Sequence, residues 1–218
     1  MRTNPFLDSL LFLIGYDGNY KPLGFWQYPL IVFFDLLVAA NLVLAFVNLL
    51  DDPAQRTGRS VFLWAARSLI GAMWFQGTLW KLPLPVSGGF TYWMNQIAQN
   101  AAWGSMQHFY HDVLIPHIAI INIVAYVAET CFAISLMLGL AVRLTGIVGV
   151  LFTANIWLGL YHNGSEWPWQ YMFLMLTMGF LAIDGAGRGL GLDALLRRWS
   201  DRNQYDRSWL MRLHRLGS

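Results

Sequence analysis

Long apolar segments separated by short polar breaks dominate the pattern of this chain. Five of these segments have close to the roughly 20 residues that an α-helix needs to cross a bilayer. The pattern therefore predicts an all-α fold, a polytopic membrane helical bundle with five transmembrane helices. Their expected ranges are 25–50, 61–82, 113–138, 141–160 and 167–183.

Three further segments lie outside the predicted spans. Residues 1–24 contain an apolar run that is too short to cross, so we expect them to lie at the membrane interface. Residues 84–112 place apolar side chains opposite amides at helical spacing, which predicts an uncharged amphipathic loop helix in the outer headgroup layer. Residues 185–218 form a basic cytoplasmic tail, which leaves residues 25–184 as the expected transmembrane bundle.

The composition supports a membrane protein and excludes several other classes. The chain of 218 residues is 56% hydrophobic and 12% charged, whereas a soluble domain has about 25% charged residues. The arginines lie beside the predicted spans rather than on a soluble face, so nucleic acid is not an expected partner. Cys131 is the single cysteine, which excludes a disulfide within the chain, CxxC redox chemistry and an Fe–S cluster.

The distribution of lysine and arginine predicts the orientation in the membrane, because cytoplasmic loops are enriched in both. The predicted cytoplasmic side holds Arg56, Arg59, Arg143, Arg188, Arg197, Arg198, Arg202, Arg207, Arg212 and Arg215. The other side holds Arg2, Lys21 and Lys81. Five crossings with this split place the N-terminus outside and the C-terminus in the cytoplasm.

The segment RSLIGAMWFQGTLWK, residues 67–81, combines the hydrophobicity of a span with a cation at each end. A buried cation in a spanning helix costs roughly 2.5–3.5 kcal/mol on insertion scales, so each charge requires an explanation. We expect Lys81 to reach the outer interface at little cost. Residues at i, i+4, i+7, i+11 and i+14 share one helical stripe, which we expect to face inward. These residues are Arg67, Gly71, Trp74, Thr78 and Lys81.

A second polar stripe lies in the predicted third span. Asn122, Tyr126 and Glu129 are spaced i, i+4 and i+7, and Glu129 is near mid-membrane. An isolated carboxylate at this depth is expected to be neutral or paired, and Arg67 is its predicted partner. Two interpretations stay open: an ion pair that fixes helix packing, or a polar pocket that binds a headgroup or handles protons.

The histidines offer little evidence for a metal or haem. His117 and His162, near the outer ends of two spans, are the one pair suited to bis-histidine haem ligation. The sequence has neither a CxxCH nor an HExxH motif, and it has no cysteine cluster. We therefore expect no metal and no haem.

A quinone site needs an apolar slot with one or two donors for the carbonyl oxygens. The predicted quinone or anion site at the outer end combines Lys81, Trp74, Trp80, His117 and His162. The aromatic residues have an alternative interpretation, because aromatic belts are common at membrane interfaces.

Three segments together resemble the DoxX/DoxD family of membrane proteins. The second predicted span contains RSLIGAMWFQGTLWKL, and the turn after the third contains AETCFAISLMLGLAVRLTG. The segment after the last span contains AIDGAGRGLGLDALL. The resemblance covers about residues 60–197, and the order and spacing of its three parts agree.

The resemblance implies a four-helix core in a prokaryotic cytoplasmic membrane, to which this chain adds an N-terminal span and a tryptophan-rich outer loop. The family includes the membrane subunit of thiosulfate:quinone oxidoreductase, which implies electron transfer to the quinone pool, often with a partner subunit. No residue here is assigned as an electron carrier. The family motif positions correspond to Arg67, Lys81, Glu129, Arg143, Gly185, Gly187, Gly189 and Asp193.

Three functional hypotheses follow. The first is a subunit of a quinone-linked oxidoreductase, in which Arg67 and Glu129 organise the polar centre and Lys81, with His162, meets thiosulfate or quinone near the outer face. The second is a non-catalytic membrane anchor of a redox complex, and the third is a small transporter. The expected partners are membrane lipids, quinone, and either a protein subunit of a redox complex or further copies of this chain.

Overall fold

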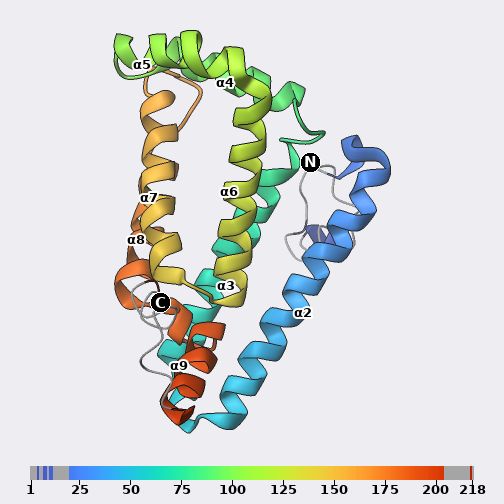
Figure 1. Ribbon diagram of the computed structural model, residues 1–218, viewed down its shortest axis with the longest axis vertical. Helices are drawn as coiled ribbons and strands as arrows, with labels where there is room; N and C mark the ends of the chain where they lie inside the picture. Colours follow the sequence, from blue (N-terminus) through green and yellow to red (C-terminus); the bar gives the residue numbers. More distant parts are fainter. Residues whose placement is uncertain (1–3, 5–6, 9, 12–19, 204–216, 218) are drawn as a thin grey trace.

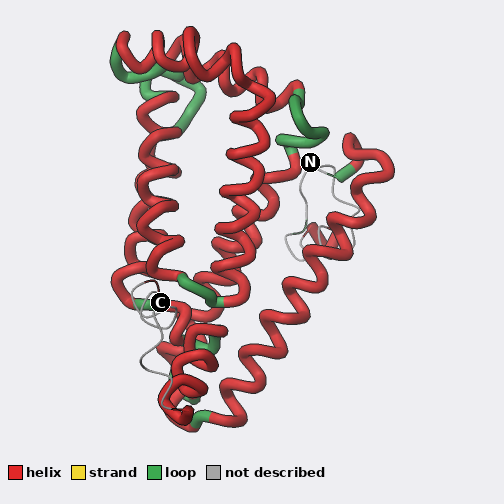
Figure 2. The backbone as a smooth tube through the Cα atoms, viewed as in Figure 1, coloured by secondary structure: helices red, strands yellow, loops and turns green. Residues whose placement is uncertain are grey.

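The computed structural model consists of helices and connecting loops, with no strand in the part of the chain that it describes (Figure 1, Figure 2). The structure describes residues 4, 7, 8, 10, 11, 20–203 and 217. The prediction for residues 1–24 and the arginine-rich end of the predicted tail therefore lie largely outside the described residues.

Five long helices run alternately up and down the molecule (Figure 1). They are α2 (Gln27–Asp51), α3 (Gly58–Leu79), α6 (Ile118–Leu138), α7 (Val142–Gly159) and α8 (Pro168–Asp184). The most extensive contacts join α3 to α6 and α7 to α8, while α2 runs obliquely beside them (Figure 1). The bundle is thus two packed helix pairs with a fifth helix at one side.

Local sequence signals explain where these helices begin and end. The side chain of Thr57 caps α3 by accepting a hydrogen bond from the backbone N–H of Ser60. The helices α6 and α8 each end at a glycine with left-handed backbone, Gly139 with φ of 68° and Gly185 with φ of 61°. The predicted spans match these five helices to within a few residues, apart from the third, where α6 begins five residues later than predicted.

Two short helices lie across the upper end of the bundle, the end drawn uppermost in Figure 1. They are α4 (Gly88–Asn100) and α5 (Gly104–Phe109), followed by a π-helical turn, Tyr110–Leu114, and a 3₁₀ turn, Ile115–His117. Backbone hydrogen bonds from Ala102 N–H to Leu158 O and from His162 N–H to Asn100 O, both 2.9 Å, fix this layer to the end of α7. The predicted loop helix is therefore present, and it packs on the bundle.

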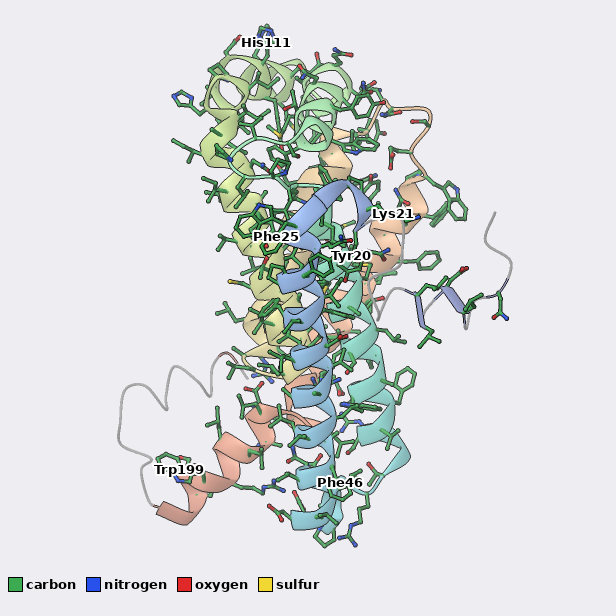
Figure 3. The ribbon with its side chains drawn as sticks, turned by 90° about the vertical axis from the view of Figure 1, so that its right-hand side faces the viewer. Tyr20, Lys21, Phe25, Phe46, His111 and Trp199 are labelled. Atoms are coloured by element: carbon green, nitrogen blue, oxygen red, sulfur yellow. The ribbon has the colours of Figure 1, made fainter. Side chains whose placement is uncertain are left out.

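The lower end is closed by the 3₁₀ turn Ala186–Arg188 and by α9 (Leu192–Asn203). The carboxylate of Asp193 accepts hydrogen bonds from the N–H groups of Ala141 (2.9 Å) and Val142 (3.4 Å), at the start of α7. Arg198 of α9 donates to Asn48 of α2 at 2.8 Å. The first part of the predicted tail is therefore an integral part of the fold. Trp199 lies at this end and His111 at the other (Figure 3).

Within the described residues, three helices are long and apolar enough to cross a membrane by length and composition: Lys21–Asp51, Gly104–Leu138 and Val142–Gly159. The prediction of five spans is not confirmed. The helix α8 has 17 residues, about 26 Å at 1.5 Å per residue, which is less than the hydrocarbon core of about 30 Å. The helix α3 has 22 residues but carries two arginines and several glycines and hydroxyl groups.

Candidate functional site

A cavity of about 390 Å³ lies at the upper end, beneath α4. The apolar face of α4 lines it with Phe90, Trp93, Met94 and Ile97. This face is the one that the amphipathic spacing predicts, but it covers protein rather than headgroups. Because Ser87 caps α4 and its hydroxyl donates to Trp80 O at 2.9 Å, the end of α3 sets the position of the whole helix.

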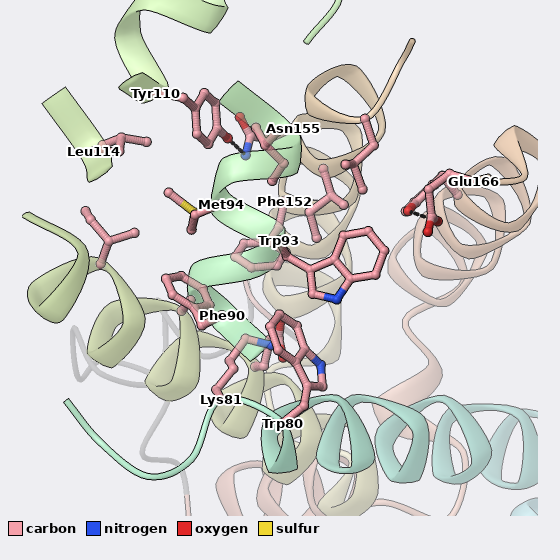
Figure 4. Close-up of a pocket in the computed structure, with 17 residues that line it drawn as sticks. Trp80, Lys81, Phe90, Trp93, Met94, Tyr110, Leu114, Phe152, Asn155 and Glu166 are labelled. Atoms are coloured by element: carbon pink, nitrogen blue, oxygen red, sulfur yellow. Dashed lines mark hydrogen bonds and ion pairs between the residues drawn. The ribbon is translucent and has the colours of Figure 1, made fainter. Parts of the chain in front are cut away.

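Three pairs of polar side chains line the same cavity (Figure 4). Lys81 Nζ donates to Glu129 Oε2 at 2.6 Å. Asn155 Nδ2 donates to the Tyr110 hydroxyl at 2.7 Å. On another side of the cavity the Tyr171 hydroxyl donates to Glu166 Oε2, also at 2.7 Å. The rest of the lining is largely aromatic and aliphatic, so a few polar groups face an otherwise apolar space.

The ion pair of Lys81 and Glu129 is the central feature of this site. Both side chains are nearly fully buried, with exposed fractions of 2% and 6%. Lys81 Nζ reaches one turn back along α3 to donate to Gly77 O at 2.9 Å, and it lies 3.8 Å from the centroid of the Trp80 ring. The geometry holds the Lys81 amine against an aromatic wall of the cavity, the arrangement of a cation–π contact.

Two predictions about these charges are therefore wrong. Glu129 pairs with Lys81, not with Arg67, and Lys81 does not reach the outer interface. The reason is the layer of α4, which covers the end of α3 and separates Lys81 from the surface. Glu129, which was predicted to pair with Arg67 at the lower end of α3, therefore pairs with Lys81 at the upper end of α3.

Arg67 is completely buried at the lower end and is held by backbone oxygens. Its Nη1 donates to Leu136 O at 2.6 Å and Met137 O at 2.7 Å, and its Nη2 donates to Leu190 O at 3.1 Å. The last carbonyls of a helix have no partner within it, and they form the negative end of its dipole. Arg67 therefore joins the end of α6 to Leu190, in the link between the 3₁₀ turn and α9. This role is structural.

The inward direction predicted for the stripe on α3 is confirmed, because all five of its residues are buried. Trp74, which was predicted to line a quinone site, packs below the cavity in an edge-to-face cluster with Phe132 (5.0 Å) and Phe152 (5.8 Å). Phe152 itself lines the cavity. Trp74 thus supports the floor of the site, whereas Trp80 and Lys81 border it directly.

The two predicted histidines do not take part. His117 and His162 are both exposed, and neither lines the cavity. His117 Nδ1 is 2.8 Å from Val113 O, one turn earlier in the chain. Among the residues that the structure describes, no group of three or more His, Cys, Asp or Glu side chains could hold a metal ion.

The remaining members of the predicted polar centre are divided between two places. Asn122 is buried and donates to Lys81 O (2.9 Å) and Pro85 O (3.1 Å), so it holds the chain as it leaves α3. Tyr126 lies on a second, apolar cavity of about 680 Å³ between α6 and the start of α2. This second cavity is bordered by Leu82 and several residues that begin α2.

Sequence reasoning missed two groups that complete the first cavity, Tyr110 and Glu166, and it did not predict that they pair with Asn155 and Tyr171. These four residues come from the π-helical turn, α7, the loop between α7 and α8, and α8, which meet only after folding. The helical spacing of Phe90, Met94 and Ile97 was the one signal in the sequence for the face of α4 that covers the cavity.

Comparison with known proteins agrees with the resemblance in the sequence. The family model described as "TQO small subunit DoxD" matches residues 62–216. The match begins within α3 and includes every residue of the cavity. No curated protein matches this chain, and no solved structure matches it.

Proposed function

The chain belongs to the DoxD family, and we propose that it is the quinone-binding membrane subunit of a complex of the thiosulfate:quinone oxidoreductase type. The observation that carries the proposal is the apolar cavity beneath α4 with the buried ion pair of Lys81 and Glu129 on its wall. Quinone would be the bound cofactor and electron acceptor.

The size and lining of the cavity support a neutral aromatic ligand. Its volume of about 390 Å³ is within the range of roughly 300–1,000 Å³ that is usual for small-molecule sites. Trp80 and Phe90 have nearly parallel rings, with centroids 6.1 Å apart. A quinone ring would pack against this aromatic wall, with a carbonyl oxygen directed at a donor such as Lys81 or Asn155.

The charges at the cavity oppose an anionic ligand. The positive charge of Lys81 is neutralised by Glu129, and Glu166 adds a further carboxylate. A thiosulfate dianion would gain little attraction and would lose its hydration. We therefore propose that thiosulfate is oxidised on a partner subunit, and that Lys81 serves the quinone instead.

Reduction of a quinone to a quinol takes up two electrons and two protons. In the proposed site the electrons come from thiosulfate through the partner subunit. The Lys81 ammonium would stabilise negative charge on a quinone carbonyl oxygen and would supply one of the two protons. The second proton, and the proton that recharges Lys81, would come from solvent. Glu129 keeps the ammonium charged and directed at the cavity.

The proposal also includes the topology. With α2, α3, α6, α7 and α8 all crossing, the lower end, which holds Arg56, Arg59 and Arg143, would face the cytoplasm. The cavity would then lie near the outer face of a prokaryotic cytoplasmic membrane. The polar groups of α3 are compatible with crossing, because Arg67 and the neighbouring Lys81 face protein instead of lipid, and Arg59 lies in the first turn of the helix, at its end.

The first test is the binding of decylubiquinone to the purified chain, measured as quenching of its tryptophan fluorescence. Ala125 lines the cavity, so Ala125→Phe should fill it and abolish saturable quenching. Ile120 is on the same helix and is 61% exposed, so Ile120→Phe is the matched control and should bind normally. Equal binding by both variants would reject the site.

The second test is thiosulfate-dependent quinone reduction by the complex purified with its partner. Removing both charges with Lys81→Met and Glu129→Leu should lower turnover by about 100-fold, while Lys21→Met, an exposed lysine near the same end, should not. If the doubly substituted complex retains full turnover, the ion pair has no catalytic role. A purified chain that assembles with its partner but binds no quinone would support the anchor hypothesis.

A further inference from the structure

Three arginines gather at the lower end of the α7–α8 pair. A Cβ atom placed on Gly185 would lie 3.6 Å from Arg143 Nη2 and 3.7 Å from Arg188 Nε, so the two guanidinium groups flank the same point. Partial burial, with the nearby charges of Arg197 and Arg143, lowers the pKa of Arg188. Like charges are therefore held close together where the chain leaves α8.

Two carboxylates, Asp193 and Asp184, lie near these arginines. Asp193, which attracts Arg188, also accepts hydrogen bonds from two backbone N–H groups that begin α7. Asp184 forms an ion pair with Arg59. The three guanidinium groups and Asp193 together carry a formal charge of +2, three positive charges and one negative, so the phosphate of a lipid would place a further negative charge beside the arginines.

Apolar surface continues directly from this cluster along the bundle. Arg143, Ile147 and Leu151 are spaced four residues apart on α7 and lie on one face. Ile147 is 51% exposed and Leu151 is 66% exposed, while Ile183, next to Asp184, is 85% exposed. Such a surface has a cationic end that complements an anionic headgroup and an aliphatic side that complements acyl chains, as a phospholipid requires.

We propose that Arg143, Arg188 and Arg197 bind the phosphate of an anionic phospholipid, whose acyl chains lie along Ile147 and Leu151. The site is independent of the quinone cavity, which is at the other end of the bundle. Basic pockets of this kind at the ends of membrane helices suit lipid headgroups, with about 1 kcal/mol per arginine near the surface. This energy corresponds to about fivefold in affinity.

Native mass spectrometry of the detergent-solubilised chain, titrated with phosphatidylglycerol, would test the site. Phosphatidylcholine with the same acyl chains is the lipid control, and inorganic phosphate tests for a soluble anion. Arg143→Gln and Arg188→Gln should each weaken phosphatidylglycerol binding by about fivefold. Arg56→Gln is the matched control, because Arg56 lies at the same end and donates to Leu49 O (2.7 Å) and Leu50 O (3.1 Å).

Arg188→Lys, which retains the charge, should keep most of the binding and shows that a loss in Arg188→Gln is not due to misfolding. The proposal is overturned if phosphatidylcholine binds equally well, or if Arg56→Gln weakens binding as much as the two cluster variants do. Displacement of the lipid by millimolar inorganic phosphate would also overturn it, because the cluster would then be a site for soluble anions.

Discussion

Arg67 in α3 and Lys81, two residues beyond its end, share one helical stripe about four turns apart, and both are almost completely buried. Their partners differ in kind. Arg67 binds three backbone carbonyl oxygens at a closed corner of the fold. Lys81 binds one backbone carbonyl and the carboxylate of Glu129 on the wall of a cavity.

This difference in partners separates a buried cation that only stabilises the fold from one that can react with a ligand. Backbone carbonyls at the end of α6 cannot titrate, and the cation that satisfies them is enclosed on all sides. A lysine and a carboxylate can exchange protons with a ligand, and this pair adjoins a space where a ligand fits. Burial of a charge is therefore not by itself a mark of function; the partner and the adjacent cavity decide.

The largest expected effect on stability comes from replacing Arg67. Arg67→Leu leaves three buried carbonyls without a donor, at roughly 1–3 kcal/mol each, so we expect a loss of about 3–9 kcal/mol and little folded protein. Folded yield by gel filtration and the thermal midpoint measure it. Arg59→Gln is the control, because Arg59 is 71% exposed in its pair with Asp184 and should contribute at most about 1 kcal/mol. Equal stability of the two variants would contradict the role of Arg67.

The next effect concerns the ion pair. Lys81→Met leaves the carboxylate of Glu129 buried and unpaired, and we expect a loss of about 3–5 kcal/mol. Adding Glu129→Leu should restore most of the thermal midpoint, because apolar replacement of a buried pair is often neutral. A doubly substituted protein as unstable as Lys81→Met would show that the pair is not an isolated unit.

A smaller effect is expected at the glycine that gives Arg67 its space. A Cβ atom on Gly139 would lie 2.8 Å from both Arg67 Cζ and Gly191 Cα, and the residue has φ of 68°. Gly139→Ala should destabilise the protein by about 1–2 kcal/mol from backbone strain alone, with displacement of Arg67 adding to it. Gly58→Ala, at a position with no atom nearby, should leave the thermal midpoint unchanged or raise it slightly.

The smallest effect is expected for the histidines. His117→Ala and His162→Ala should change stability by no more than about 0.5 kcal/mol and leave quinone binding unchanged, because both side chains are exposed and outside the cavity. Fluorescence titration with decylubiquinone checks this result. A loss of affinity in either variant would extend the site to the outer surface.

Much of the fold could be predicted from local signals. Long apolar segments and the spacing on α4 correctly indicated the helices and the approximate positions of most of their ends. The family was also predicted from short motifs, and the match over residues 62–216 confirms it. The pairing of charges could not be predicted in the same way, because it depends on where two helices meet.

The sequence by itself determined that this chain is a helical membrane protein of the DoxD family, and that its second predicted span, α3, turns a polar stripe inward. Hydrophobic length and periodicity encode that result locally, residue by residue. Only the tertiary structure decided that Glu129 belongs to Lys81, that backbone oxygens hold Arg67, and that α4 closes a cavity. Those outcomes depend on the register of α3 against α6 and on the layer above them, which no single segment specifies.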